Sequence, residues 1–461
     1  MMDLNLSSFT SRRQSMRKKS TTTNIESPEV KLNTSSRLQS RDVRWDKLDN
    51  TAHLFPVIAG EKMSNVYRIS VTLTELVEPE ILQQALDIVL PKFELFNVRL
   101  RRGFFWHYFE ENVKSAPRVH EENQFPCRYI RRGSNNDYLF RVTYYKYRIN
   151  LEVFHVLTDG MGGLNFLREL TYQYLRLRHP EIMCRTEDCL SSGTTLNRED
   201  SFLKNYRDLD HKPYSTQRAY LIKGEALRNG EFGVMHGYIK LAELKKVCAR
   251  YGVSINDYLV SAMIWSVYTE CLNSAPSEKS IRIAVPVNLR PYYNSNTTKN
   301  FFAIVHAEFR PEKDKYSFEE LLYAVSADLR SKLSYENLER IISYNVSNQV
   351  STLARLAPLP LKNIAMRHIY RRSGLSSTST LSNMGKVDIA ELYRPYIELF
   401  HGYMAVSMGQ PIKGTVFTYN DTLVFSFSYV LKDPGVQRGF FRRLREDGLS
   451  VEIESNGVNY G

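Results

Sequence analysis

The stretch from residue 138 to residue 178 constrains the fold more than any other part of the sequence. Apolar and polar side chains alternate over 138–144 and again over 148–154, which is the period of half-buried strands. Over 160–178 the apolar residues instead recur at helical spacing. The two periods predict a pair of strands followed by a helix, and they place His155 at the end of the second strand.

The residues that follow this histidine form a recognisable pattern. Asp159 and Gly160 come at the start of the predicted helix, in the sequence His-Val-Leu-Thr-Asp-Gly. A histidine held at a strand end is a candidate general base near neutral pH, because its ordinary pKa lies close to the working pH. The alternative, a buried core histidine followed by a helix-capping aspartate, stays open at this point.

Length and composition limit the classes of protein that fit. The chain has 461 residues, of which 43% are hydrophobic, enough for one large domain or two of moderate size. No apolar stretch is long enough to cross a membrane, and no secretory signal is recognisable. The five cysteines are scattered without a Cys-x-x-Cys pair, so the sequence predicts neither a disulfide framework nor a metal site. We therefore expect a cytoplasmic protein.

The chain carries a formal net charge of +12. A basic surplus suits an anionic small molecule, an anionic membrane surface or nucleic acid, although a solvated basic surface is the simplest alternative. The basic residues are spread along the chain and accompany no nucleic-acid-binding motif. We expect no nucleic-acid partner and no transmembrane segment, and we keep peripheral membrane contact as an alternative.

Changes in composition predict four consecutive parts of the chain. Residues 1–44 are rich in Ser, Thr, Arg and Lys and predict a disordered basic tail. Residues 45–200 predict a first lobe that contains the His155 motif. Residues 201–235 have weak patterning and predict a connection, and residues 236–461 predict a second lobe. Strand-like and helix-like segments mix in both lobes, which indicates an α/β protein.

Four segments together resemble one known superfamily, the chloramphenicol-acetyltransferase-like, CoA-dependent acyltransferases. In chain order they are His155–Gly160 (the HxxxDG signature), 249–259 (Ala-Arg-Tyr-Gly-Val-Ser-Ile-Asn-Asp-Tyr-Leu), 285–291 (Val-Pro-Val-Asn-Leu-Arg-Pro, with Asn300-Phe301-Phe302 just beyond) and 381–385 (Leu-Ser-Asn-Met-Gly). The matches spread over about residues 45–455. The alcohol acetyltransferase and condensation-domain-like branch looks closest, partly from the opening Trp45…Leu48-Asp49-Asn50.

The resemblance implies both a fold and an activity. The implied fold has two chloramphenicol-acetyltransferase-like lobes, each a mixed sheet flanked by helices, with the active-site channel at their junction. The implied activity moves an acyl group, an acetyl group being the first choice, from acyl-CoA to an alcohol hydroxyl without a covalent enzyme intermediate. Acyl-CoA (acetyl-CoA) is then a co-substrate, no cofactor is tightly bound, and the acceptor is a small alcohol or a lipid-like molecule.

The resemblance also assigns roles to individual residues. His155 is the implied catalytic base. Asp159 and Gly160 are implied to be structural, with Asp159 paired to an arginine of the second lobe, for which Arg290 is our candidate. An exposed helix-capping Asp159 with a solvated Arg290 is the alternative. Candidates for the oxyanion donor or the channel wall lie on one predicted strand: Ser379, Ser382 and Asn383. These three residues equally suit a strand edge or turn.

Other functions remain open on the sequence. Many relatives have a histidine before the catalytic one, where this chain has Phe154, and the plant-type DFGWG motif is absent. A condensation-type enzyme would take its acyl group from an acyl carrier protein and form an amide or ester. A non-catalytic binding protein of the same fold is a third possibility. Residues 367–372 (Arg-His-Ile-Tyr-Arg-Arg) are a candidate contact for CoA phosphate or a membrane, against a solvated helix face.

Overall fold

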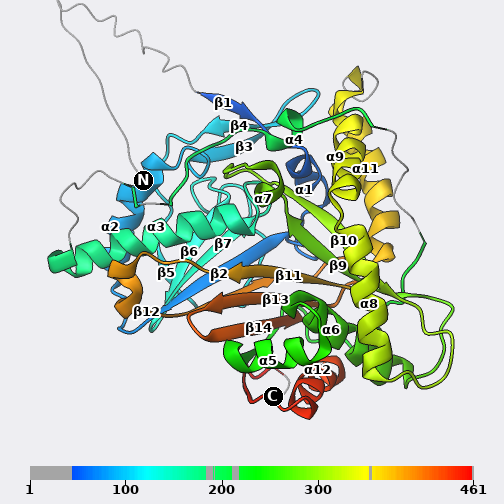
Figure 1. Cartoon of the computed structure of the whole chain (residues 1–461). Helices are drawn as coiled ribbons and strands as arrows, with labels where there is room; N and C mark the ends of the chain where they lie inside the picture. Colours follow the sequence, from blue (N-terminus) through cyan, green and yellow to red (C-terminus); the bar gives the residue numbers. More distant parts are fainter. Residues whose placement is uncertain (1–43, 183–189, 192, 210–216, 352–355, 459–461) are drawn as a thin grey trace, which may run out of the picture. The chain divides into compact units, whose positions relative to one another are not determined.

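The computed structural model describes residues 44–458 except for 183–189, 192, 210–216 and 352–355. These residues belong to one structural unit that begins at Arg44. The predicted basic tail, apart from Arg44 itself, lies outside the described residues. Within the described part, Figure 1 shows strands gathered into sheets with helices along their faces.

Two large sheets form the framework of the described residues. The first has five strands in the order β12-β2-β7-β6-β5, and the second has seven in the order β10-β9-β11-β13-β14-β8-β15. The first comprises β2 (Val66–Leu73), β5 (His120–Glu121), β6 (Phe140–Tyr145), β7 (Arg148–Phe154) and β12 (Ile397–Met404). The second comprises β8 (Gly233–Lys240), β9 (Ile281–Asn288), β10 (Phe302–Phe309), β11 (Ser379–Lys386), β13 (Ile412–Tyr419), β14 (Thr422–Tyr429) and β15 (Val451–Ser455).

A small third sheet and the helices complete the described fold. The small sheet consists of β1 (Trp45–Lys47), β4 (His107–Glu111) and β3 (Val98–Arg102). The α-helices are α1 (Phe55–Ile58), α2 (Pro79–Val89), α3 (Gly160–Arg178), α4 (Ser201–Lys204), α5 (Leu241–Tyr251), α6 (Ile255–Leu272), α7 (Arg290–Tyr293), α8 (Phe318–Lys332), α9 (Tyr335–Val350), α11 (Leu359–Ser373) and α12 (Gly435–Glu446). Short 3₁₀ turns lie at Thr51–His53, Leu90–Lys92, Pro180–Ile182, Gly374–Ser376 and Glu391–Tyr396.

Each large sheet is covered by the helices whose sequence suits that position. α3 packs beside α2 on the five-stranded sheet (Figure 1). It buries its apolar side chains there. α6 packs against the seven-stranded sheet and against the helices α8 and α12, which also contact that sheet. It is apolar around its whole circumference, which suits a helix enclosed on several sides. A capping box between Ser254 and Asp257 fixes its first turn.

One strand departs from the predicted division of the chain. β12 comes from the range assigned to the second lobe, yet it pairs antiparallel with β2 in the sheet of the first lobe. Without β12, the long strand β2 would present an unpaired edge, which is a liability that proteins cover. The sequence pattern of a strand does not state which edge it will pair with, so this exchange was not predicted. The first lobe therefore needs residues 397–404 to complete its sheet.

Candidate active site

The loop that carries His155 is held at both ends. At its start, the backbone N–H of His155 donates to the carbonyl of Asn65 at 2.9 Å. At its end, α3 begins at Gly160, and the Asp159 carboxylate accepts a hydrogen bond from the N–H of Gly162 at 3.1 Å. Asp159 is thus the N-cap of the helix, where a carboxylate satisfies a free N–H group. The predicted strand, loop and helix are all present.

Asp159 also forms a paired contact with Arg290 from the second half of the chain. The guanidinium donates two hydrogen bonds to the carboxylate, at 2.9 and 3.0 Å, and both side chains are largely buried. The same guanidinium donates to the carbonyls of Thr297 and Lys299, each at 2.8 Å. The N–H of Phe301 donates to Asp159 at 2.9 Å. Asp159 therefore joins the histidine loop to the segment between β9 and β10, and its carboxylate is used in that structural contact.

The glycines after Asp159 allow a close approach to that segment. A Cβ atom on Gly162 would lie 2.4 Å from the backbone carbonyl of Thr298 and 1.9 Å from the hydroxyl of Thr158. Contact with backbone cannot be relieved by a side-chain rotation, so this position requires glycine. A Cβ on Gly160 would meet the side chain of Met384 on β11 at 2.8 Å. The start of α3 is therefore pressed between the two halves of the chain.

The ring of His155 lies among aromatic side chains and is half-buried. Phe55 stacks on it with ring centroids 4.6 Å apart, and Tyr67 meets it edge-on at 5.2 Å. Phe302 lies against it at 5.7 Å. These contacts restrict rotation of the ring and remove water from its surroundings. Burial is the main reason that the pKa of His155 is lowered from its ordinary value, so the imidazole is neutral at pH 7.

A hydrogen-bond relay connects His155 to a buried carboxylate. Nδ1 of His155 lies 3.1 Å from Oδ1 of Asn300. The Nδ2 amide of Asn300 donates to Asp49 at 2.8 Å, and its backbone N–H donates to the same oxygen at 3.2 Å. The other oxygen of Asp49 accepts from the N–H of Ala52 at 2.8 Å. Asp49 thus holds Asn300 in one orientation, with its carbonyl oxygen toward the histidine.

This relay determines which nitrogen of the imidazole carries the hydrogen. The amide group of Asn300 faces Asp49 because a carboxylate accepts hydrogen bonds, and its oxygen therefore faces Nδ1. A carbonyl oxygen can only accept a hydrogen bond, so Nδ1 carries the proton. Nε2 is left with a lone pair. A neutral imidazole with a free Nε2 is the form that a general base requires.

Burial also acts on the carboxylate at the far end of the relay. It raises the pKa of Asp49 from 3.8 to about 7, against the hydrogen bonds from Asn300 and Ala52, which lower it. The folded protein therefore binds this proton more tightly than the unfolded chain does. The contribution of Asp49 to stability is full at low pH and is lost as the pH rises from about 4 to about 7.

Replacement of Asp49 by Asn tests this pH dependence. We expect wild type to lose stability relative to Asp49→Asn between pH 5 and pH 8, by on the order of a few kcal/mol, because only wild type ionises there. Urea unfolding of both proteins at the two pH values measures the difference. Parallel changes in the two proteins would contradict the assignment of a raised pKa to Asp49.

The sequence interpretation did not assign a role to Asn300 or Asp49. Both lie in segments that carry the family resemblance, the Trp45–Asn50 opening and the Asn-Phe-Phe run at residue 300. In the sequence, both residues could have been noticed as polar side chains that stand next to an apolar stretch. Their contact joins residues 251 positions apart, and no periodicity in the sequence reports a contact at that separation.

The candidate oxyanion donors lie on β11, and Ser379 is fully buried there. Its hydroxyl donates to the carbonyl of Ile412 on the neighbouring strand β13 at 2.5 Å. A hydroxyl has a single hydrogen, so this bond uses the donor that an oxyanion would need. We therefore no longer assign that role to Ser379.

Ser382 and Asn383 lie further along the same strand, toward the start of α3. The hydroxyl of Ser382 has a long contact of 4.0 Å with the sulfur of Met384, the residue that faces Gly160. Asn383 accepts from the N–H of Gly385 at 2.9 Å and makes a 3.5 Å amide contact with Asn256. Ser382 is the better candidate of the two, because its hydroxyl hydrogen is engaged only by a weak acceptor.

The basic segment 367–372 forms the second half of α11. Arg367 donates to the carbonyl of Val57 at 3.0 Å, while the apolar side chains of Ile364 and Ile369 are exposed. Arg367 of this segment thus makes a structural contact. A contact of this helix with CoA phosphate or a membrane stays a prediction.

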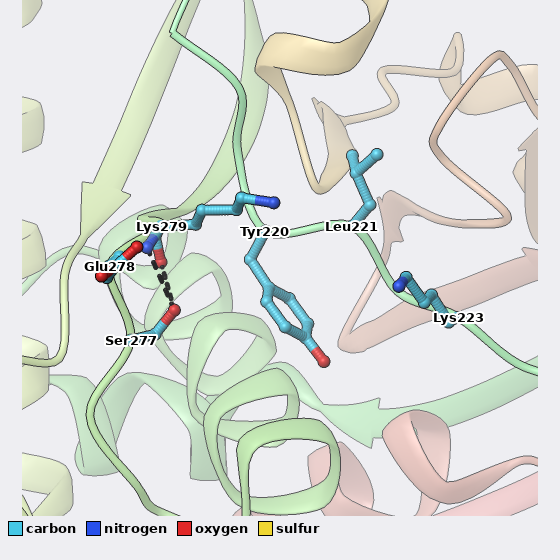
Figure 2. A pocket seen from close by; sticks show the side chains of 6 residues that line it. All are labelled: Tyr220, Leu221, Lys223, Ser277, Glu278 and Lys279. Carbon is cyan, nitrogen blue, oxygen red and sulfur yellow. Dashed lines mark hydrogen bonds between the residues drawn. The ribbon is translucent and has the colours of Figure 1, made fainter.

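A surface pocket is lined by none of the predicted site residues. Figure 2 shows the Tyr220 ring between the loop at residues 277–279 and Lys223. The pocket has a volume of about 330 Å³ and is lined by Tyr220, Leu221, Lys223, Ser277, Glu278 and Lys279. We assign it no part in catalysis. The described residues contain no cluster of three or more His, Cys, Asp or Glu suited to a metal ion.

Comparisons with known proteins show what the chain resembles. No protein-family model and no curated protein matches it. Several solved structures, in contrast, do match this chain. TRI101 of F. graminearum, complexed with coenzyme A and T-2 mycotoxin, has 12% sequence identity and a TM-score of 0.59, over 88% of this chain and 99% of that one. The fold is that of the two-lobed, chloramphenicol-acetyltransferase-like proteins. The predicted fold class is thereby confirmed.

Two further structures extend the comparison beyond TRI101. Polyketide synthase associated protein 5 of Mycobacterium tuberculosis has 14% identity and a TM-score of 0.57, over 86% of this chain and 96% of that one. The epimerization domain from the third module of tyrocidine synthetase B has 11% identity and a TM-score of 0.54, over 88% and 97%. The similarity establishes a shared fold. In the part of the chain that the structure describes, no helix has both the length and the apolar character needed to cross a bilayer.

Proposed function

We propose that the protein transfers an acyl group, with acetyl as the first choice, from acyl-CoA to an alcohol hydroxyl. The observation that carries the proposal is the imidazole of His155, which is neutral and presents a free Nε2 lone pair because Asn300 accepts the hydrogen on Nδ1. Nε2 takes the proton of the hydroxyl while its oxygen attacks the thioester carbonyl. The C–S bond then breaks, and the same proton passes to the leaving thiolate of CoA.

The surroundings of His155 support a direct transfer. The carboxylate of Asp159 is occupied by Arg290, so it maintains the shape of the loop and takes no proton from the reaction. Ser382 on β11 is the proposed donor to the oxygen of the tetrahedral intermediate, a role in which one hydrogen bond makes a large contribution. TRI101, which shares the fold, is complexed with coenzyme A in its solved structures, and this supports a CoA thioester as donor.

The test is acceptor-dependent release of CoA thiol from a panel of acyl-CoAs with pooled alcohols and amines. Release that requires an alcohol supports the proposal and begins to define both substrates. Release that requires an amine corrects the acceptor class. Acyl transfer from an acyl carrier protein, without transfer from any acyl-CoA, would favour the condensation-type alternative. The similarity to the epimerization domain is the reason to test that donor. Binding of a ligand without acyl transfer from either type of donor would favour a non-catalytic role.

Asn300 is the proposed positioning residue of the reaction. Asn300→Ala removes the acceptor for Nδ1–H, so the ring can adopt the other tautomer, and we expect kcat to fall by up to about 100-fold. The hydrogen bond that His155 donates to Asn300 raises the pKa of His155, so its loss shifts the acid limb of the pH–rate profile to lower pH. The profile of kcat/KM against pH for both proteins measures the shift. An unmoved acid limb would count against the relay.

A further inference from the structure

One face of the seven-stranded sheet is polar although it is buried. On β13, alternate residues point to opposite sides: Ile412 and Val416 enter the core of the second lobe, whereas Phe417 joins the core of the first. Lys413 and Thr415 share the face of Phe417. This junction face, defined here as the side of the seven-stranded sheet that faces the first lobe, therefore places a lysine and a threonine between the two cores.

Neighbouring strands continue the polar character of the junction face. Thr415 pairs in register with Ser382 of β11 and with Ser426 of β14, while Lys413 pairs with Ser428. The hydroxyl of Ser428 donates to the carbonyl of Met404 in β12 at 2.7 Å, which shows that the first lobe lies over this face. Ser426 is paired with His236 at 2.8 Å. The hydroxyl groups of these two serines therefore have hydrogen-bond partners within the protein.

Lys413 and Thr415 differ from their neighbours in having no such partner. Lys413 is 9% exposed, and among the described residues no hydrogen bond or ion pair to its ammonium is found. Thr415 is 5% exposed, and no described group bonds to its hydroxyl oxygen. A largely buried cation without a counter-ion and a fully buried hydroxyl without a partner are both costly. Two adjacent costly groups on one face point to a ligand that satisfies both.

The pair lies close to the proposed catalytic base. The charge of Lys413 is near enough to lower the pKa of His155. Thr415 is the register neighbour of Ser382, which lies beside the residue that contacts Gly160. Burial lowers the pKa of Lys413 itself to about 8, so the ammonium form still predominates at pH 7. A ligand that meets this cation therefore lies within electrostatic range of His155.

We propose that Lys413 and Thr415 bind a carboxylate that one of the two substrates carries beside its reacting group. One ammonium and one hydroxyl match the two oxygens of a carboxylate, and a charge-assisted hydrogen bond in a buried place is strong. The inference rests on the proposed function, because it defines the substrate class of that same site. The carboxylate belongs either to a hydroxy acid as acceptor or to a dicarboxylic acyl group on CoA, such as malonyl or succinyl.

The experiment compares matched substrates in two arms. The acceptor arm sets 2- and 3-hydroxycarboxylates against neutral alcohols of the same chain length, with acetyl-CoA as donor. The donor arm sets malonyl-CoA and succinyl-CoA against acetyl-CoA, with a neutral alcohol as acceptor. Wild type is expected to prefer the carboxylate-bearing substrate in one arm by at least about tenfold in kcat/KM, and the arm that shows the preference identifies which substrate carries the group.

Variants show whether the preference comes from this pair. Lys413→Met keeps the length of the side chain and removes the charge, and Thr415→Val keeps the shape and removes the hydroxyl. Each is expected to reduce the preference ratio, and Lys413→Met to abolish it. Lys245→Met, which removes an exposed lysine of α5, is the matched control and should retain it. No preference in either arm, or a preference that Lys413→Met retains, would overturn the inference.

A binding measurement separates this inference from the proposed function. Titration calorimetry follows the carboxylate-bearing compounds and their neutral counterparts with wild type and Lys413→Met. Tight binding of the carboxylate compound by wild type, lost in Lys413→Met, supports the carboxylate site even when no CoA is released, and in that case only the acyl-transfer proposal fails. Equal binding by both proteins counts against the site whether or not transfer occurs.

Discussion

His155→Ala is expected to lower kcat for CoA release by roughly 10² to 10⁴-fold, the range that a positioned general base contributes. The ring is the proton acceptor in the proposed reaction, and no other described group is assigned that task. Removal of a half-buried ring that stacks on Phe55 also leaves a space. Because the contacts of the loop backbone remain, we expect the variant to fold. Thiol release with the preferred acyl-CoA and acceptor measures the effect.

The control for this prediction is His368→Ala, which removes an exposed histidine of α11. It should retain the activity of wild type. A melting temperature of His155→Ala close to that of wild type, together with the lost activity, separates loss of the base from loss of the fold. Turnover of His155→Ala at the rate of wild type would reject His155 as the base.

Arg290→Ala is expected to have the largest effect on stability, with a loss of about 3–5 kcal/mol in the free energy of unfolding. The change leaves the buried carboxylate of Asp159 without its bidentate partner. It also leaves the carbonyls of Thr297 and Lys299 without their donor. Urea unfolding at pH 7 measures the loss. Because these contacts position the segment that contains Asn300, kcat should fall as well.

Two variants make the result specific to the pair. Arg290→Lys keeps the charge but cannot make the forked contact, so its stability should lie between those of wild type and Arg290→Ala. Arg310→Ala removes an exposed arginine just after β10 and should leave stability unchanged. An Arg290→Ala protein as stable as Arg310→Ala would contradict a structural role for the ion pair.

Local periodicity was sufficient to predict the elements around the site. The alternation in β6 and β7 and the helical spacing of α3 predicted the strand, the loop and the helix that hold His155. Asp159 and Arg290 were paired by the family resemblance, and the two residues form an ion pair in the structure. Local periodicity and motifs thus predicted those parts of the site whose geometry is determined by short segments of the chain.

Local patterns did not predict the contacts between polar residues that are far apart in the sequence. The relay from His155 through Asn300 to Asp49 depends on where three loops meet, and each residue alone looks like an ordinary turn or cap residue. Lys413 is similar, because its sequence context is that of any strand residue. Only the arrangement of the sheets shows that it is buried without a partner. The sheet membership of β12 escaped prediction for the same reason.

The position of β12 has a consequence for how the protein is made. Asn300 is synthesised 145 residues after His155, and the strand that completes the first sheet begins only at residue 397. While the ribosome is still working, the first half of the chain has neither its edge strand nor the partner of its histidine, although domains commonly fold as they emerge. Newly made chains should therefore have no catalytic competence until synthesis is nearly finished. A gene fragment that ends before β12 should yield an aggregation-prone product that cannot transfer acyl groups from acyl-CoA in the cell.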